Sequence, residues 1–178
     1  MAVLQTIRNL FVPVREDVAP EIVIPAPPTA YEVHILTEKH LKEVLRLNLR
    51  CFPKGENYTK YTFNYLLEMP NGLSYRAVTA SGDMAAFLFV ASDTKGIGHI
   101  TTIGVAPEHR QRGLAKMLLE KAEKALRERK IFTIVLEVRV GNTTAQNLYK
   151  SCGYAITQRI NKYYNNGEDC FIMVKSIY

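Results

Sequence analysis

The alternation of two hydrophobic periods along the chain is the feature that most restricts its fold. From Tyr31 onward, short stretches with alternating or β-branched apolar residues are separated by stretches whose apolar residues recur at helical spacing. The first pattern is typical of strands and the second of amphipathic helices. Their order is β-α-α-β-β-β-α-β-α-β-β. We therefore expect an α/β fold with a mixed central sheet of about seven strands and helices on both faces.

Local signals set the expected limits of these elements. Thr37 and Asn142 are residue types that commonly cap helix N-termini, and Gly153 stands where a helix C-terminal cap is expected. The expected strands span residues 31–36, 73–80, 84–92, 98–105, 131–140, 154–164 and 168–177. The expected helices span residues 38–49, 59–69, 114–126 and 142–152. One apolar face of the first helix is expected to hold Leu41, Val44, Leu45 and Leu49.

The N-terminal region differs from the rest of the chain in composition. Residues 1–29 are expected to form a Pro-rich extension, and residues 30–178 to form the folded domain. The stretch VAPEIVIPAPPTA contains no helical period and favours extended, polyproline-II-like structure. It either packs on the domain as a strand or stays loose.

Composition excludes several classes of protein. No apolar run is long enough to cross a membrane, and charges such as Arg15 and Asp17 interrupt the apolar core that a signal peptide needs. The three cysteines lack Cys-x-x-Cys spacing, so we expect no structural zinc and a reducing, cytoplasmic compartment. The net charge of +6 is compatible with a nucleotide-like cofactor, RNA or an acidic surface as partner.

A glycine stands inside a strongly basic loop, directly before the third expected helix, in the sequence VAPEHRQRGLAKML. A helix N-terminus carries unpaired N–H groups and partial positive charge, and the N–H groups of a preceding loop can form an anion-binding nest. Gly113 and the small Ala115 would allow the backbone to approach a diphosphate closely. Positive charge around it would come from Arg110, Arg112 and Lys116. We interpret the loop as a diphosphate site; the alternative is a basic surface loop before an ordinary helix. The Gly-Lys-Ser/Thr sequence of Walker-type nucleotide sites is missing.

Together with its flanking segments, this loop resembles the GNAT acetyltransferases. Arg110–Ala115 fits their R/Q-x-x-G-x-G/A loop, which binds acetyl-CoA, and LEVRVGNTTAQNLYKSCGY follows as the next strand and helix. The resemblance covers residues 31–178 and narrows to the Nα-acetyltransferases, the ribosomal-protein-alanine type and its archaeal and eukaryotic relatives. The segments that carry it are ENYTKY, GHITTIGV, LEVRVGN and KYYNNGEDCFIM.

The resemblance implies acetyl-CoA as cofactor, CoA as product and no metal. In that family the strand before the loop separates from its neighbour, and pantetheine pairs with the freed backbone. Asn142 matches a position that contacts the cofactor, although a plain helix cap would also explain it. The residues that the resemblance assigns to acetyl-CoA are Ile103, Gly104, Val105, Arg110, Gln111, Arg112, Gly113, Leu114, Ala115, Lys116 and Asn142.

The same resemblance implies Glu137 as general base and Tyr149 as general acid. Deprotonating an α-amino group with a pKa near 8 costs only about 1.4 kcal/mol at pH 7, against about 4.6 kcal/mol for lysine. One carboxylate suffices for the first task. Two structural alternatives stay open: an ion pair between Glu137 and Arg139, and a core role for Tyr149. No Cys/His/Asp arrangement suggests nucleophilic catalysis, so direct transfer is expected.

Substrate contacts are implied for a set of mainly aromatic positions. Glu56 matches a proposed second base, but Lys54 and Gly55 stand where the family has proline directly before ENY, which puts that assignment in doubt. His99 and Thr101 lie in a match to the family sequence Gly-His-x-x-Ser, with threonine in place of serine, but His99 is explained equally well as a structural strand histidine. His109 is interpreted as a surface residue. The implied substrate-binding residues are Glu56, Tyr58, Thr101, Tyr163 and Tyr164.

These observations favour transfer of acetyl to the free α-amino group of a protein or peptide, for which a ribosomal protein is one candidate. A GNAT enzyme that acts on lysine side chains or small amines is the first alternative. A non-enzymatic basic module that binds RNA or the ribosome is the second, although aromatic residues are not interleaved with Lys and Arg as in single-strand binders. We expect neither membrane association nor direct nucleic-acid binding.

Overall fold

The expected order of strands and helices is confirmed by the computed structural model, which describes residues 22–53, 57–92 and 96–178. The strands are β1 (Tyr31–Ile35), β2 (Leu73–Thr79), β3 (Met84–Ser92), β4 (Ile97–Val105), β5 (Thr133–Arg139), β6 (Ala155–Ile160) and β7 (Cys170–Ser176). The helices are α2 (Leu41–Cys51), α3 (Lys60–Glu68), α4 (Leu114–Glu128) and α5 (Thr143–Ser151). Two short 3-10 helices, η1 (Glu38–His40) and η2 (Pro107–His109), precede α2 and α4.

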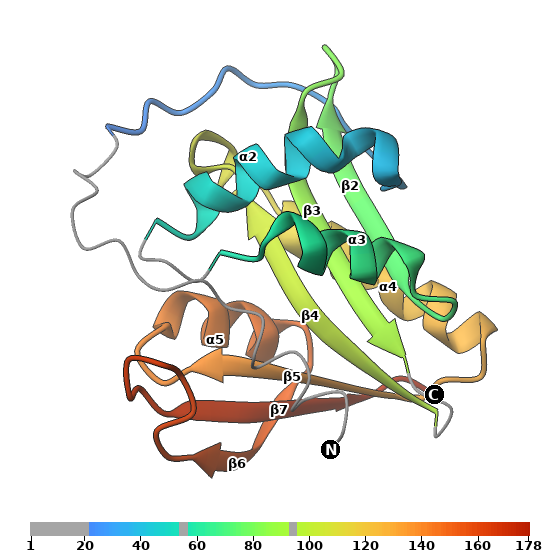
Figure 1. Ribbon diagram of the computed structural model, residues 1–178, viewed down its shortest axis with the longest axis vertical. Coiled ribbons are helices and arrows are strands. Elements are labelled where there is room, and N and C mark those ends of the chain that lie inside the picture. Colours follow the sequence, from blue (N-terminus) through green and yellow to red (C-terminus); the bar gives the residue numbers. More distant parts are fainter. Residues whose placement is uncertain (1–21, 54–56, 93–95) are drawn as a thin grey trace.

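The strands form one mixed sheet in the order β1-β2-β3-β4-β5-β7-β6. Neighbouring strands run antiparallel, except that β4 and β5 run parallel. Their parallel pairing joins Ile97, Gly98 and His99 to Thr133, Ile134 and Val135. Figure 1 shows β4 and β5 diverging beyond this short paired region.

Helices cover both faces of the sheet, as expected. On one face, Phe63 of α3 packs against Phe87 and Phe89 of β3, with ring centroids 6.1 and 5.1 Å apart. The intervening Leu88 belongs to the core on the opposite face, together with Leu118 of α4. Successive strand residues point to opposite faces, so β3, which is buried from Ala85 to Ala91, is apolar over that whole stretch. In Figure 1, α2 and α3 lie in front of β2 to β4, and α4 lies behind them.

The apolar face of α2 differs from the prediction at one position. Leu49 was expected to face the core, but it is 60% exposed, whereas the neighbouring Asn48 is 1% exposed. Asn48 lies seven residues after Leu41, two full turns along the same face, so helical geometry brings this amide inside. Its Nδ2 donates to Asn57 Oδ1 at 3.2 Å and to the Tyr58 carbonyl at 3.4 Å.

Two other predicted limits also need correction. The sixth strand was expected to reach Tyr164 but ends at Ile160, so Tyr163 and Tyr164 lie in the connection between β6 and β7. The first helix was expected from Glu38 but opens as the 3-10 turn η1, and α2 begins at Leu41.

Residues 22–30 have no regular secondary structure and lie against the segment between β4 and α4. The Ala26 N–H donates to the Glu108 carbonyl at 3.0 Å, and Thr29 Oγ1 accepts from the Ala80 N–H at 3.3 Å. The predicted extension thus contacts the domain over its described part; residues 1–21 lie outside the described residues. Within the described ranges, no helix combines the length and apolar character needed to cross a membrane.

Candidate active site

The backbones of β4 and β5 separate beyond a short parallel pairing, and the gap between the two backbones is here called the opening. Beyond the parallel pairing that ends at His99 and Val135, β4 remains paired with β3 up to Val105, and β5 with β7 up to Arg139. One backbone edge of each strand therefore faces the opening with its own N–H and C=O groups. The residues predicted to pair with pantetheine, Ile103, Gly104 and Val105, lie in this part of β4.

Glu137 and His99 form a hydrogen bond across this opening. His99 Nε2 lies 2.6 Å from Glu137 Oε2, and the two side chains are only 8% and 11% exposed. The alternative partner considered for Glu137, Arg139, forms its ion pair with Glu168. Glu137 Oε1 and His99 Nδ1 are buried and have no hydrogen-bond partner among the described residues. Since a buried polar atom without a partner is costly, Glu137 Oε1 is suited to bind a group that a substrate brings.

Tyr58 is held beside this pair by bonds at both of its ends. Its hydroxyl donates to the Thr101 carbonyl at 3.1 Å, and its own carbonyl accepts from buried Asn48. Thr101 is the extra residue of a β-bulge, because Phe89 aligns with Thr102 and Val90 with Ile100. Burial raises the pKa of Tyr58 far above its ordinary value, and the nearby Glu137 and Tyr163 raise it further. The Tyr58 hydroxyl therefore stays protonated.

The basic loop presents an anion-binding geometry at the start of α4. Gln111 and Gly113 both have positive φ, 60° and 77°. A Cβ on residue 113 would meet no atom within 4 Å, so glycine is required here by the backbone angle rather than by crowding. The first intrahelical bond runs from the Met117 N–H to the Gly113 carbonyl, which leaves the preceding N–H groups of the first turn without an intrahelical acceptor.

The side chains of this loop divide between solvent and the domain. Arg110 and Lys116 are exposed, whereas Leu114 is buried in the core. The Arg112 guanidinium is directed to the N-terminal segment, where it donates to the carbonyls of Ala26 and Pro27 and to the Tyr31 hydroxyl. The diphosphate would therefore meet backbone N–H groups first.

Residues 41–154 match the family model of the acetyltransferase (GNAT) family. The chain belongs to this family. Over 144 residues it is 33% identical to the N-alpha-acetyltransferase daf-31 of Caenorhabditis elegans, covering 77% of this chain and 78% of the relative. It is 35% identical over 136 residues to the N-terminal acetyltransferase A complex catalytic subunit NAA10 of Arabidopsis thaliana, covering 73% and 69% of the two chains. The resemblance stated from the sequence is thereby confirmed at the family level.

Solved GNAT structures share the architecture described above. The ribosomal-protein-S18-alanine N-acetyltransferase of Escherichia coli superposes with a TM-score of 0.76 at 26% identity, over 83% of this chain and 94% of that one. Ard1 from Thermoplasma volcanium reaches a TM-score of 0.77 at 21% identity, over 84% and 99% of the two chains.

Tyr149 of this GNAT chain is part of the core. It is 6% exposed and lies edge-on to Tyr154, with ring centroids 5.8 Å apart. Burial raises its pKa far above the ordinary value for tyrosine, with further contributions from Cys152 and Glu137. The structure thus supports the packing role, and its role as general acid remains a prediction.

Asn142 lies at the start of the same helix and acts as its cap. Its Oδ1 accepts from the Ala145 N–H at 3.0 Å. Buried Gln146 closes the preceding turn by donating to the carbonyls of Arg139 and Val140 at 3.0 and 2.8 Å. The cap role is therefore observed, and a cofactor contact by Asn142 stays a prediction.

Arg139 anchors the connection between β6 and β7 to the sheet. Its guanidinium lies 3.7 Å from the centre of the Tyr164 ring and pairs with Glu168. Glu168 Oε1 accepts from the Gly141 N–H at 2.9 Å, which ties the connection to the turn after β5. The rings of Tyr163 and Tyr164 are 5.1 Å apart and nearly perpendicular. Arg139 at the end of β5 thus contacts Tyr164 directly, and Tyr163 contacts the Tyr164 ring.

Gly104 and Cys51 show how β4 is held against α2. A Cβ on Gly104 would lie 2.6 Å from the Phe87 ring and 2.9 Å from Cys51 Sγ, so glycine is required by packing. The Cys51 thiol donates to the Val105 carbonyl at 3.3 Å. Burial raises its pKa to about 12. Because the thiolate is the reactive form, Cys51 is a poor nucleophile.

Two residues at the site were not recognised from the sequence. The sequence leaves the role of His99 open, and only the register of β4 and β5 reveals that it meets Glu137. Asn48 could have been found from the sequence, because it is a polar residue on the apolar stripe of an amphipathic helix.

His109, interpreted as a surface residue, is half-buried, with Nδ1 2.9 Å from the Tyr31 hydroxyl. Glu56, the predicted second base, lies outside the described residues.

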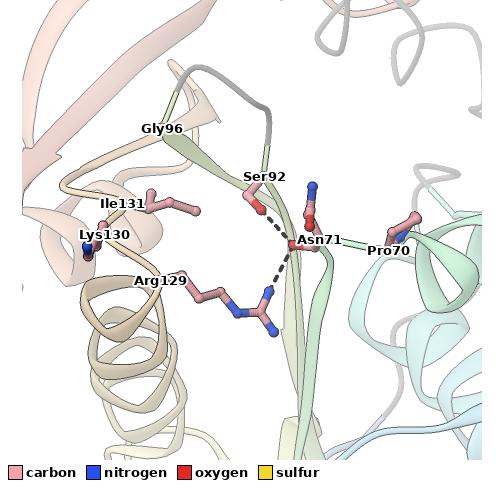
Figure 2. A pocket seen from close by; sticks show the side chains of 7 residues that line it. All are labelled: Pro70, Asn71, Ser92, Gly96, Arg129, Lys130 and Ile131. Atoms are coloured by element: carbon pink, nitrogen blue, oxygen red, sulfur yellow. Dashed lines mark hydrogen bonds between the residues drawn. The ribbon is translucent and has the colours of Figure 1, made fainter.

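A separate hollow lies near the start of β4, away from the opening between β4 and β5. Figure 2 shows Ser92 and Arg129 directed at the same Asn71 carbonyl, at 2.6 and 3.2 Å. The two bonds tie the turn before β2 to the end of β3 and to the end of α4. Its lining consists of Pro70, Asn71, Ser92, Gly96, Arg129, Lys130 and Ile131. No cluster of metal-ligating side chains occurs in the parts of the chain that the structure describes.

Proposed function

We propose that the chain transfers acetyl from acetyl-CoA to the free α-amino group of a protein or peptide. The observation that carries this proposal is the buried Glu137–His99 pair in the opening between β4 and β5, where Glu137 Oε1 has no partner among the described residues. The names of its relatives in C. elegans and Arabidopsis, which state N-alpha and N-terminal acetyltransferase activity, support the same substrate class.

The residues present fit acetyl-CoA along one continuous path. The backbone edge of β4 at Ile103–Val105 would pair with pantetheine, and the N–H groups of residues 111–116 would bind the diphosphate, helped by the dipole of α4. Arg110 and Lys116 add positive charge on the exposed side, and Leu114 and Ala115 complete the first turn. When bound, acetyl-CoA supplies the acetyl group as an activated thioester, and CoA leaves.

Glu137 acts as the base that removes a proton from the substrate ammonium, so that the neutral nitrogen can attack the acetyl carbon. Its Oε1 atom has no partner among the described residues and would take this proton, while His99 holds Oε2 at 2.6 Å and fixes the carboxylate. For an α-amine the proton costs only about 1.4 kcal/mol at neutral pH. A carboxylate is a weak base, so this pair is matched to α-amines better than to lysine.

Tyr149 donates the proton of its hydroxyl to the departing sulfur. The raised pKa keeps its hydroxyl protonated at neutral pH, as a proton donor requires. The attacking amine forms the new amide bond as the thioester bond breaks, and the released sulfur takes the proton of the Tyr149 hydroxyl. The amide nitrogen then gives up its second proton, which restores the Tyr149 hydroxyl through solvent.

Aromatic side chains around the opening would hold the first residues of the peptide. Tyr58 is fixed at Thr101, and Tyr163 and Tyr164 are fixed through Arg139. Such rigid tyrosines supply contact area and hydroxyl groups at little entropic cost. Glu56 would join them as the second base that the resemblance implies.

For the physiological partner we propose a protein N-terminus, with a ribosomal protein as one candidate, because the E. coli structure bears that substrate in its name. We place the reaction in the cytoplasm, because the three cysteines are free, as expected in a reducing compartment.

Two measurements test this function against its alternatives. In a thermal melt, CoA at a hundredfold excess over Kd should stabilise the protein by about 2.7 kcal/mol, whereas a non-enzymatic RNA-binding module should respond to RNA instead. A peptide that carries both a free α-amine and an internal lysine should then be acetylated on the α-amine, as located by fragmentation mass spectrometry. Acetyl on the lysine would assign the enzyme to the lysine class.

A further inference from the structure

We propose that Arg112 is a positioning residue that fastens the segment 26–31 to the diphosphate loop and thereby holds the loop in its cofactor-binding form. This inference rests on the proposed use of acetyl-CoA. It adds to that proposal the dependence of the cofactor site on a segment that lies more than eighty residues earlier in the chain.

The first observation is the direction of the Arg112 side chain. Its guanidinium donates to the carbonyls of Ala26 and Pro27 and to the Tyr31 hydroxyl, with the Pro27 and Tyr31 bonds both 2.9 Å long. An arginine placed to contact a diphosphate directly would be directed into the loop, whereas this one is committed to another part of the chain. Its planar fork suits two adjacent carbonyls and a hydroxyl, and a lysine ammonium would not reproduce that geometry.

The second observation is that the same segment binds the loop at further points. The Ala26 N–H donates to the Glu108 carbonyl at 3.0 Å, and the Tyr31 hydroxyl lies 2.9 Å from His109 Nδ1. Arg50 of α2 holds the Glu108 carboxylate from the other side through two bonds of 3.0 and 2.9 Å. The turn before α4 is therefore clamped between the N-terminal segment and α2.

The third observation is the strained backbone that this clamp surrounds. Arg112 stands between Gln111 and Gly113, which both have positive φ. Glycine adopts this region freely, but for glutamine it is unfavourable and persists only where the surroundings hold it. The N–H groups of this part of the loop are those that would face the diphosphate. Loss of the clamp should let Gln111 relax and should scatter these donors before the cofactor binds.

The test separates loss of the clamp from loss of charge. Ala26→Pro removes only the N–H that binds Glu108. Because Ala26 precedes Pro27, it is already restricted to extended conformations that proline can adopt. Arg112→Lys keeps the positive charge but loses the forked donor geometry. Tyr31→Phe removes one hydroxyl. Ile24→Pro, two residues before this segment at a position that is 78% exposed, is the matched control.

We expect Ala26→Pro and Arg112→Lys each to raise the KM for acetyl-CoA on the order of tenfold, with kcat at saturation changed less than about twofold. Tyr31→Phe should shift KM in the same direction by a smaller factor, and Ile24→Pro should match the wild type. The KM for the peptide should not move in any of them.

Three results would overturn the inference. The first is an unchanged KM for acetyl-CoA in Ala26→Pro and Arg112→Lys. The second is full activity of Arg112→Lys beside a defective Arg112→Met, and the third is a lower melting temperature of these variants with no change in KM. The second would assign Arg112 a simple charge effect and the third a simple structural one. Failure of the wild type itself to bind CoA would instead refute the proposed function.

Discussion

Glu137 and His99 stand on neighbouring parallel strands and meet through a hydrogen bond of 2.6 Å, just where those strands begin to separate. His99 aligns with Val135, two residues before Glu137, so both side chains project on the same face of the sheet. Glu137 Oε1, on the other side of the carboxylate, has no hydrogen-bond partner among the described residues. The Glu137 carboxylate is therefore largely shielded from bulk water and oriented by His99.

Glu137→Gln should lower kcat on the order of a hundredfold at pH 7, because the amine loses its base. Without a base, the rate should follow the fraction of substrate that is already neutral, which for an α-amine is about one tenth at pH 7 and about one half near pH 8. The pH–rate profile should therefore shift upward. Gln keeps the size of Glu and can still bond His99, so folding should be unaffected. A profile identical to that of the wild type would move the base to Glu56 or to water.

Gly113→Glu should abolish measurable CoA binding, because it combines a strained backbone angle with negative charge at the diphosphate site. Gly113→Ala is the matched control, since it keeps the backbone strain of a positive φ without the charge. That strain should weaken CoA binding about tenfold in Gly113→Ala. Isothermal titration with CoA measures the affinity of each variant. Wild-type affinity in the Glu variant would remove the diphosphate from this loop.

Tyr149→Phe should lower kcat on the order of a hundredfold while the Kd for CoA changes less than about twofold. The hydroxyl is the only group removed, and the ring keeps its edge-on contact with Tyr154. Steady-state kinetics and CoA titration on the same preparation give the two values. A variant with normal kcat and a much lower melting temperature would leave Tyr149 as a core residue alone.

Arg139→Lys should raise the KM for the peptide on the order of tenfold and leave the KM for acetyl-CoA unchanged. Lysine keeps the charge but cannot both stack on Tyr164 and pair with Glu168 as the guanidinium does. Lys150→Arg, at an exposed position of α5, is the control for substitution of a surface cation. Equal changes in the two KM values would show that Arg139 supports the whole site rather than the peptide side.

The element order and the layered fold were predictable because they depend on local periodicity. Strands such as β3 and β5 are bounded by turn residues and carry an apolar pattern, so their limits agree with the structure within about two residues. The basic loop was recognised because Gly113 interrupts charge directly before a helix. The reason for a glycine at position 113 was only partly predictable, since the positive φ at Gly113 and Gln111 is a property of the folded turn.

The partners of the site residues could not be predicted, because they depend on long-range register. His99 reaches Glu137 only through the parallel pairing of β4 with β5, and Arg112 reaches Pro27 only because the extension crosses the loop. The predicted burial of Leu49 was wrong for a local reason, because Asn48 takes the inward position two turns after Leu41. Tyr163 and Tyr164 were expected in a strand, but Asn161 and Lys162 form a turn directly after Ile160, and Lys162 has a positive φ of 49°.

The most direct test of the central claim is acetyl transfer to matched peptides. Peptides with free N-termini beginning Ala, Ser, Met-Leu and Met-Glu would be compared with N-blocked versions that carry an internal lysine. The account predicts transfer to free termini, none to blocked peptides, and loss of that transfer in Glu137→Gln. Transfer confined to the blocked lysine peptides would contradict it, while the fold and the membership of the GNAT family would stand.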